Sequence, residues 1–115
     1  MVSDTVAAIP LPVIYFANNS SSLTKKETDK LDAVVKMMKA RPEITLSISG
    51  HASNIGSKDY NDCLSKRRAN AVKALLMHRG IDASRLIPVV GKGIDREAPT
   101  SMDARRVELI MNKKQ

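Results

Sequence analysis

The stretch that decides the fold is residues 50–72, which read GHASNIGSKDYNDCLSKRRANAV. In the segment just before it, residues 43–50, apolar side chains occupy every second position, which predicts a strand with one buried face. A polar loop follows this strand. A helix is then expected over about residues 57–79, with Gly80 supplying the residue that ends it.

Arg68 lies on the apolar side of this expected helix, and the residues expected to share this buried face with it are Tyr60, Leu64, Ala71, Val72 and Leu75. Arg67 is rotated by about 100° from it and is expected to face solvent. A buried guanidinium needs a partner, and its planar fork suits a carboxylate. Two partners remain open: a ligand carboxylate held in the preceding loop, or an internal ion pair with Glu108 or Asp59.

Two further elements are expected before this stretch. The apolar run Val13–Phe16 predicts a short buried strand. Thr24 and Glu27 are spaced as a capping box, which predicts a helix that starts there and ends near Ala40 or Arg41. Its buried face repeats with helical spacing and consists of Leu31, Val34, Val35 and Met38.

Two strands are expected after it. Leu86–Gly91 is expected at a sheet edge, because Pro88 has no amide to donate. A loop over Gly91–Asp103 leads to a last strand over Arg105–Met111. The order β-α-β-α-β-β predicts an α+β fold, a two-layer sandwich with a mixed four-stranded sheet and both helices on one face.

The composition bounds the function. The 115 residues suit one domain, expected over residues 13–115 after a flexible leader at 1–12. The net charge of +7 favours anionic partners. The single cysteine, Cys63, excludes an internal disulfide, and no apolar run is long enough to span a bilayer. The start of the chain lacks a signal peptide, so the protein is either cytosolic or a domain whose targeting segment is missing.

Catalysis finds no support in the motifs, and no metal or cofactor is expected. His51 and His78 stand without carboxylates at metal-ligand spacing, and His51 is expected as a structural histidine hydrogen-bonded at a strand end. The positive charge alone favours nucleic acid. However, the chain lacks the aromatic stacking platform and the helix-turn-helix pattern of common nucleic-acid-binding folds, so no nucleic acid is expected.

A set of ordered motifs at characteristic spacing suggests a family. They are Phe16-x-x-Asn19-Ser20-x-x-Leu23, Gly50-His51 followed by Gly56, Tyr60-Asn61-x-x-Leu64-Ser65-x-x-Arg68-Ala69-x-x-Val72, Gly80-Ile81 with Ser84-Arg85-Leu86, and Arg105-Arg106-Val107-Glu108. In these motifs, over about residues 13–111, the chain resembles the OmpA-like C-terminal domain, the peptidoglycan-associating module also found in Pal lipoproteins and MotB stator proteins. The resemblance implies the same β-α-β-α-β-β fold.

The resemblance also implies a ligand, the diaminopimelate of the peptidoglycan stem peptide. In the family an arginine holds its carboxylate, and Arg68 matches that arginine. Asn61 matches an asparagine that lines the same pocket. The family generally has Gly-His-Thr-Asp at the end of the second strand, where the aspartate binds the ligand ammonium. Here Ala52 and Ser53 replace the threonine and aspartate, and a hydroxyl offers only a neutral contact.

Three explanations for this departure remain open. Asn54, Asp59 or Asp62 supplies the missing polar contact, or the pocket binds only the carboxylate end of the ligand, or the domain has lost peptidoglycan binding and serves as a structural or interaction domain. The expected binding residues are Arg68, Asn61, Ser53, Asn54, Ala52 and Asn19. The resemblance further implies a non-enzymatic, periplasmic, monomeric or weakly dimeric anchor, attached to a membrane only through a region outside this chain. Arg105 and Arg106 are expected to close the sheet near the pocket.

Overall fold

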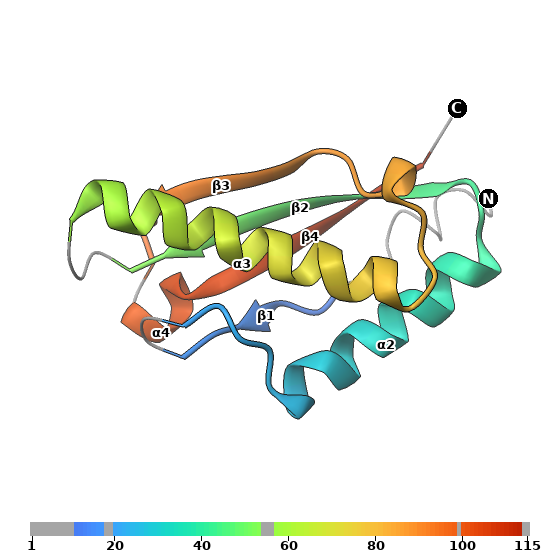
Figure 1. Ribbon diagram of the computed structural model, residues 1–115, viewed down its shortest axis with the longest axis horizontal. Coiled ribbons are helices and arrows are strands. Elements are labelled where there is room, and N and C mark those ends of the chain that lie inside the picture. The colour runs from blue at the N-terminus through green and yellow to red at the C-terminus, as the bar shows by residue number, and fades with distance from the viewer. Residues whose placement is uncertain (1–10, 18–19, 54–56, 99, 114–115) are drawn as a thin grey trace.

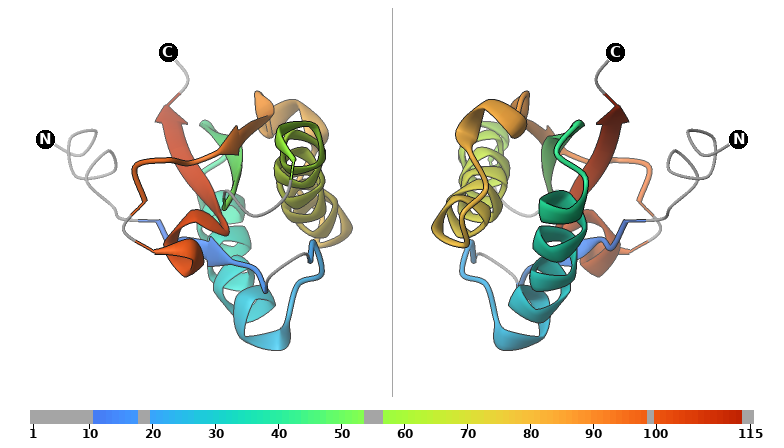
Figure 2. Two further views of the ribbon diagram at one scale, coloured as in Figure 1. Left: turned by 90° about the vertical axis from the view of Figure 1, so that its left-hand side faces the viewer. Right: turned by 90° about the vertical axis from the view of Figure 1, so that its right-hand side faces the viewer.

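The computed structural model describes residues 11–17, 20–53, 57–98 and 100–113. It contains a four-stranded sheet in the order β1-β4-β2-β3, with β2 parallel to β3 and the other pairs antiparallel. The elements are β1 (Ile14–Tyr15), α2 (Lys25–Ala40), β2 (Ile44–Ala52), α3 (Lys58–His78), the 3₁₀ turn η1 (Ala83–Arg85), β3 (Val89–Ile94), α4 (Ser101–Ala104) and β4 (Arg106–Lys113). Helices α2 and α3 cover one face of this sheet (Figures 1 and 2). The predicted two-layer α+β architecture is confirmed.

The core lies between the two helices and the sheet. On β2 the residues at every second position, Ile44, Leu46 and Ile48, are fully buried, as the alternation predicts. The four residues expected on the buried face of α2 are also buried. Arg68 is the largest fully buried side chain among the described residues, and Arg67 is exposed, so the helical phase assigned to α3 is confirmed.

Helix α3 packs unusually close to the sheet at two glycines. A Cβ atom on Gly50 would clash with the backbone carbonyl of Ser65, and one on Gly91 would clash with the backbone of Lys66. Both glycines therefore bring the first half of α3 close to β2 and β3. This close approach carries Arg68 to the end of β2.

Four local expectations are wrong. The Thr24 hydroxyl makes no capping hydrogen bond, and the Glu27 amide donates to the Thr24 carbonyl instead, at 3.0 Å. The Glu27 side chain does not reach back either, because its Oε1 accepts from the Tyr15 amide at 2.9 Å. Tyr60, expected on the buried face of α3, is 40% exposed. The third strand starts at Val89 rather than Leu86 and extends to Ile94, although its edge position is confirmed. The expected loop before the last strand contains α4, which is too short to show a helical period.

The expected leader lies mostly outside the described residues, which begin at Leu11. Leu11 packs against the core. The domain boundaries therefore stay a prediction. Within the described ranges, no helix has the length and apolar character required to cross a membrane.

Candidate functional site

Arg68 is the centre of the candidate site. It comes from the middle of α3, is fully buried, and donates hydrogen bonds to three backbone carbonyls. Its Nε donates to the Ser20 carbonyl at 2.8 Å, its Nη1 to His51 at 3.0 Å and its Nη2 to Ala17 at 3.1 Å. One guanidinium thus holds the β1–α2 loop and the end of β2 against α3.

No carboxylate forms an ion pair with Arg68 in the part of the chain that the structure describes. The expected internal partners are wrong: Glu108 pairs with Arg106, and Asp59 is an exposed residue of the first turn of α3. Burial, and secondarily the charge of Arg105, lower the pKa of the Arg68 guanidinium to about 10. Arg68 is therefore a desolvated cation whose hydrogen-bond partners are neutral.

A second arginine reaches the same loop. Arg105 Nε donates to the Phe16 carbonyl at 3.0 Å, and the Phe16 amide donates to the Arg105 carbonyl at 2.9 Å. The Phe16 ring in turn lies 5.4 Å from the Arg68 guanidinium carbon, within cation–π range. Two guanidinium groups thus contact the backbone carbonyls of Phe16, Ala17 and Ser20, which makes this end of the sheet locally positive.

The remaining predicted binding residues are only partly brought together. Ala52 and Ser53 follow His51 directly and are both buried. Asn61 is buried two turns before Arg68 on α3, where its Nδ2 donates to the Ser57 carbonyl at 2.9 Å. Asn19 and Asn54 lie outside the described residues.

The start of α3 is a capped helix end. The Ser57 hydroxyl accepts a hydrogen bond from the Tyr60 amide, as an N-cap residue does. Asp62, one of the residues considered for the missing polar contact, pairs with Lys58 at 2.8 Å. Its carboxylate therefore already has a cation beside it.

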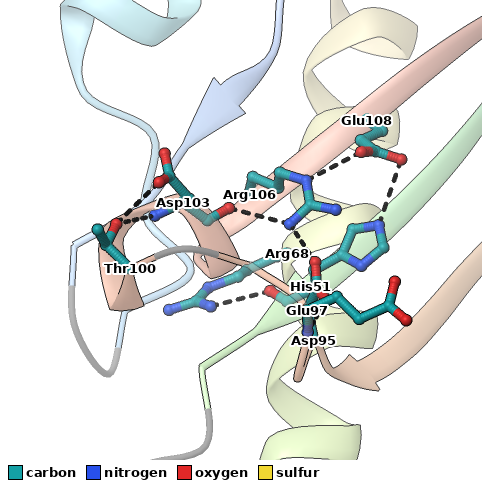
Figure 3. A network of polar contacts seen from close by, with 8 residues as sticks. All are labelled: His51, Arg68, Asp95, Glu97, Thr100, Asp103, Arg106 and Glu108. Carbon is teal, nitrogen blue, oxygen red and sulfur yellow. Dashed lines mark hydrogen bonds and ion pairs between the residues drawn. The ribbon is translucent and has the colours of Figure 1, made fainter.

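Sequence reasoning missed a polar network on the opposite face of the sheet, which Figure 3 shows. Arg106 donates from Nη1 to Asp95 Oδ2 at 2.6 Å and from Nε to Glu108 Oε2 at 2.9 Å. The period of two along β4 places Arg106 and Glu108 on this face, which was a usable signal. The position of Asp95 had none, because it depends on the path of the segment after β3.

His51 joins this network from β2. It is buried at the strand end as expected, but its Nε2 has no hydrogen-bond partner and lies 3.6 Å from Glu108 Oε1. It is the His51 backbone carbonyl that accepts a hydrogen bond at this site, from Arg68 Nη1. Burial and the nearby Arg106 lower the pKa of the imidazole, against the opposing influence of Glu108 and Asp95.

Metal binding has no support in the described ranges. No group of three or more His, Cys, Asp or Glu side chains there is placed to hold an ion. Cys63 is exposed on α3, away from the buried face.

Fold and site together define a two-layer α+β domain with a buried, carbonyl-bound arginine at the loop end of its sheet. The OmpA family model matches residues 15–107, and the chain belongs to the OmpA family. The match covers every strand and helix from the second residue of β1 to the start of β4.

Several relatives are named for peptidoglycan. The chain is 34% identical to the peptidoglycan-associated lipoprotein of Legionella pneumophila over 83% of its length, and 32% identical to that of Pseudomonas aeruginosa over 94%. It is also 31% identical to the peptidoglycan-binding protein ArfA of Mycobacterium tuberculosis over 86% of its length. It spans 57%, 67% and 32% of these three proteins, respectively.

Solved structures share the fold. The peptidoglycan-associated lipoprotein of Burkholderia pseudomallei superposes with a TM-score of 0.79 at 23% identity, covering 87% of this chain and 89% of that one. The C-terminal domain of Helicobacter pylori MotB superposes with a TM-score of 0.78 at 16% identity, covering 91% of this chain and 87% of that one. At these identities the superpositions show the fold alone.

Proposed function

We propose that this domain binds the peptide stems of peptidoglycan noncovalently and anchors an envelope protein to the cell wall from the periplasm, without catalysis. The observation that carries the proposal is Arg68. It is a fully buried cation with no ion-paired carboxylate among the described residues. A ligand carboxylate at the loop end of the sheet would supply the missing negative charge.

Electrostatics favour an anion at this position. Arg105 lies close enough to lower the pKa of Arg68, so two like charges face one region. A carboxylate between or beside them would replace repulsion with charge-assisted hydrogen bonds. The start of α3 adds the partial positive charge of a helix N-terminus. The names of the relatives supply the class of polymer that would carry this carboxylate.

The other walls of the proposed site are neutral. Asn61 and Ser53 are buried on either side of the helix–strand junction that Arg68 ties together, and we assign them to the walls of the pocket. Asn19, Asn54 and Ala52 complete the proposed set. With serine at position 53, the pocket holds the carboxylate end of the ligand more strongly than its ammonium end.

An NMR titration with a diaminopimelate-containing muropeptide tests the proposal. We expect saturable shifts confined to the β1–α2 loop, residues 50–68 and the start of β4. Arg68→Lys keeps the charge but loses the planar fork and should weaken binding at least tenfold. Arg67→Ala, one position away and exposed, is the matched control and should bind normally. Absence of shifts at millimolar ligand would contradict the proposal.

Ser53→Asp tests the neutral wall separately. If the pocket geometry is that of the family, an added carboxylate should strengthen muropeptide binding several-fold, because a charge-assisted contact replaces a neutral one. Unchanged affinity would mean that the ligand ammonium lies elsewhere.

A second candidate is a structural or interaction domain without a ligand. The observation in its favour is that Nε, Nη1 and Nη2 of Arg68 each already hold a backbone carbonyl, so the arginine has a structural task in any case. Sedimentation with purified sacculi separates the two candidates. Retention that Arg68→Lys abolishes supports binding, whereas no retention of the wild-type protein supports the structural role.

A further inference from the structure

An open cleft of about 510 Å³ lies on the face of the sheet opposite α2 and α3. Arg106 and Glu108 line it, and they alternate along β4 with Val107 and Leu109, which belong to the core. The segment after β3 forms its other wall. The polar and aromatic residues of the lining are Tyr15, Asp95, Glu97, Asp103, Arg106 and Glu108.

The cleft is acidic on a basic protein. Its lining carries four carboxylates and one guanidinium. In contrast, residues 25–41 and 58–79, which hold α2 and α3, carry 12 of the 19 basic and 5 of the 12 acidic residues, and hence the whole net charge of +7. The rest of the chain is therefore neutral overall, and its acidic residues are concentrated in the lining of this cleft.

Arg106 does not neutralise this cleft. Its guanidinium is engaged with Asp95, Glu108 and the Asp103 carbonyl, at 2.6, 2.9 and 2.9 Å. Glu97 is exposed, and no described cation forms an ion pair with its carboxylate. The Asp103 carboxylate accepts only from the neutral Thr100 hydroxyl, at 2.9 Å. At least two lining carboxylates therefore have no cation beside them.

His51 adds an unpartnered buried nitrogen beside the carboxylates of the cleft. Its side chain is only 9% exposed, and its Nε2 points at Glu108 Oε1 from 3.6 Å, which is too long for a hydrogen bond. Nε2 has no other partner. Glu108 Oε1 is thus left facing a ring that does not bind it, while Oε2 is held by Arg106 (Figure 3).

The apolar part of the lining suits an alkyl chain. Tyr15 is 37% exposed, and it lines the cleft together with two small apolar residues, Val13 and Ala98. Lys30 Nζ already lies 5.1 Å from the centre of this ring, so an ammonium is tolerated next to it. The charge of Lys30 is balanced by Glu27, 3.0 Å away.

We propose that this cleft binds a primary ammonium on an alkyl chain, such as a lysine side chain of a partner polypeptide, with Glu97 and Glu108 holding the cation and Tyr15 packing on the chain. This site is distinct from the one around Arg68, because it uses the other face of the sheet and attracts the opposite charge. A domain with both sites would hold an anionic group at the end of its sheet and a cationic one on its open face.

An NMR titration of the full chain with N-acetyl-lysine amide tests the proposal, with N-acetyl-norleucine amide as the uncharged probe of similar length. We expect saturable shifts at Tyr15, Ala98 and Glu108 with the lysine probe and none with the norleucine probe. Equal shifts from both probes, or shifts that do not saturate, would overturn the proposal.

Two variants make the test specific. Glu97→Gln removes a carboxylate without an ion pair, so the fold should survive, and affinity should fall about threefold, the size of an exposed charge contact. Asp59→Asn on α3 changes the net charge equally and should leave affinity unchanged. If both variants weaken binding alike, only the overall charge matters and the cleft is not a site. Arg68→Lys should not alter lysine binding, which keeps this outcome separate from the peptidoglycan proposal.

Discussion

Arg68 Nη1 and the backbone carbonyl of His51 are joined by a hydrogen bond of 3.0 Å that links the helical layer to the end of β2. The two residues also belong to different faces of the sheet. Arg68 approaches from the helical side, whereas the His51 ring lies among Arg106, Glu108 and Asp95 on the open side. His51 thus connects the candidate anion site, through its backbone carbonyl, with the polar network of Arg106, Glu108 and Asp95, through its ring.

Replacing Arg68 with alanine should lower the free energy of unfolding by about 3 kcal/mol, because three charge-assisted hydrogen bonds to backbone carbonyls are lost and a cavity is left in the core. Arg68→Lys should cost less, since an ammonium can still reach some of these carbonyls. Urea unfolding followed by circular dichroism measures both.

The matched control is Arg67→Ala. Arg67 is exposed, and its guanidinium carbon lies 5.9 Å from the centre of the exposed Tyr60 ring. Its removal should change stability by less than about 0.5 kcal/mol, as at most surface positions. If Arg68→Ala were as mild as this control, the three carbonyl contacts would not be holding the loops.

Gly50→Ala should be among the most damaging small substitutions in the chain. Its Cβ would meet the Ser65 carbonyl, which is helix backbone and cannot rotate away. The clash would push α3 off β2 and cost at least about 2 kcal/mol, the scale of core overpacking. Chemical denaturation measures the loss of stability. Shifted NMR resonances of Arg68 and Ser65 would show that α3 has moved away from β2.

Thr45→Ala, at the other end of the same strand, is the comparison. The Thr45 hydroxyl makes one long hydrogen bond of 3.4 Å in an exposed position, so its loss should cost well under 1 kcal/mol. A Gly50→Ala protein as stable as Thr45→Ala would show that α3 and β2 separate easily.

The elements that sequence predicted well are those whose burial repeats. The period of 3.6 in α2 and of two in β2 are direct consequences of packing one face against a core. The burial of Leu31 and Ile48 could therefore be predicted from the sequence. Pro88 located the sheet edge for an equally local reason. The four-residue helix α4 has too few residues for any period, and it was missed.

The site was only half predictable. Helical phase identified Arg68 as the buried arginine, but its partners are backbone carbonyls. Every residue has a backbone carbonyl, so the sequence carries no signal for which ones Arg68 binds. We therefore expected the acidic partners Glu108 or Asp59, and neither pairs with Arg68 in the fold. Likewise the acidic cleft arises because the segment containing Asp95 and Glu97 crosses β4, and such a path follows from tertiary packing rather than from local pattern.

Glu27→Ala should destabilise the fold by about 2 kcal/mol. The Glu27 side chain is 8% exposed, and its Oε1 accepts from the Tyr15 amide at 2.9 Å and from Lys30 Nζ at 3.0 Å, so its loss leaves a strand amide unpaired. Hydrogen exchange at the Tyr15 amide should accelerate more than at any other strand amide, because β1 has only two residues.

Asp29→Asn on the same helix is the control. Its ion pair with Lys25 is largely exposed, with 87% of the lysine and 59% of the aspartate side chain open to solvent. Removing this ion pair should therefore change the free energy of unfolding by close to zero. The destabilisation by Glu27→Gln should lie between those of Glu27→Ala and Asp29→Asn, since the glutamine amide oxygen still accepts from the Tyr15 amide. Unchanged exchange at Tyr15 in Glu27→Ala would mean that β1 is held by β4 alone.

Stability should decline on mild acidification because of His51. Its pKa in the folded protein lies below the ordinary 6.5, since burial and Arg106 disfavour the charged ring more than Glu108 and Asp95 favour it. The unfolded chain then binds the proton more readily than the folded one. The stabilisation is complete above pH 6.5 and is lost as the pH falls toward and through the folded pKa, so the free energy of unfolding should decrease between pH 7 and 5.5.

Urea unfolding at these two pH values, for the wild type and for His51→Gln, checks this. The variant should lose most of the pH dependence in this window, because the acidic residues titrate mainly below it. His78→Gln, on the exposed end of α3, should keep the wild-type slope. A steeper loss in His51→Gln than in the wild type would reverse the sign and mean that the ion pair of His51 with Glu108, not burial, controls the imidazole.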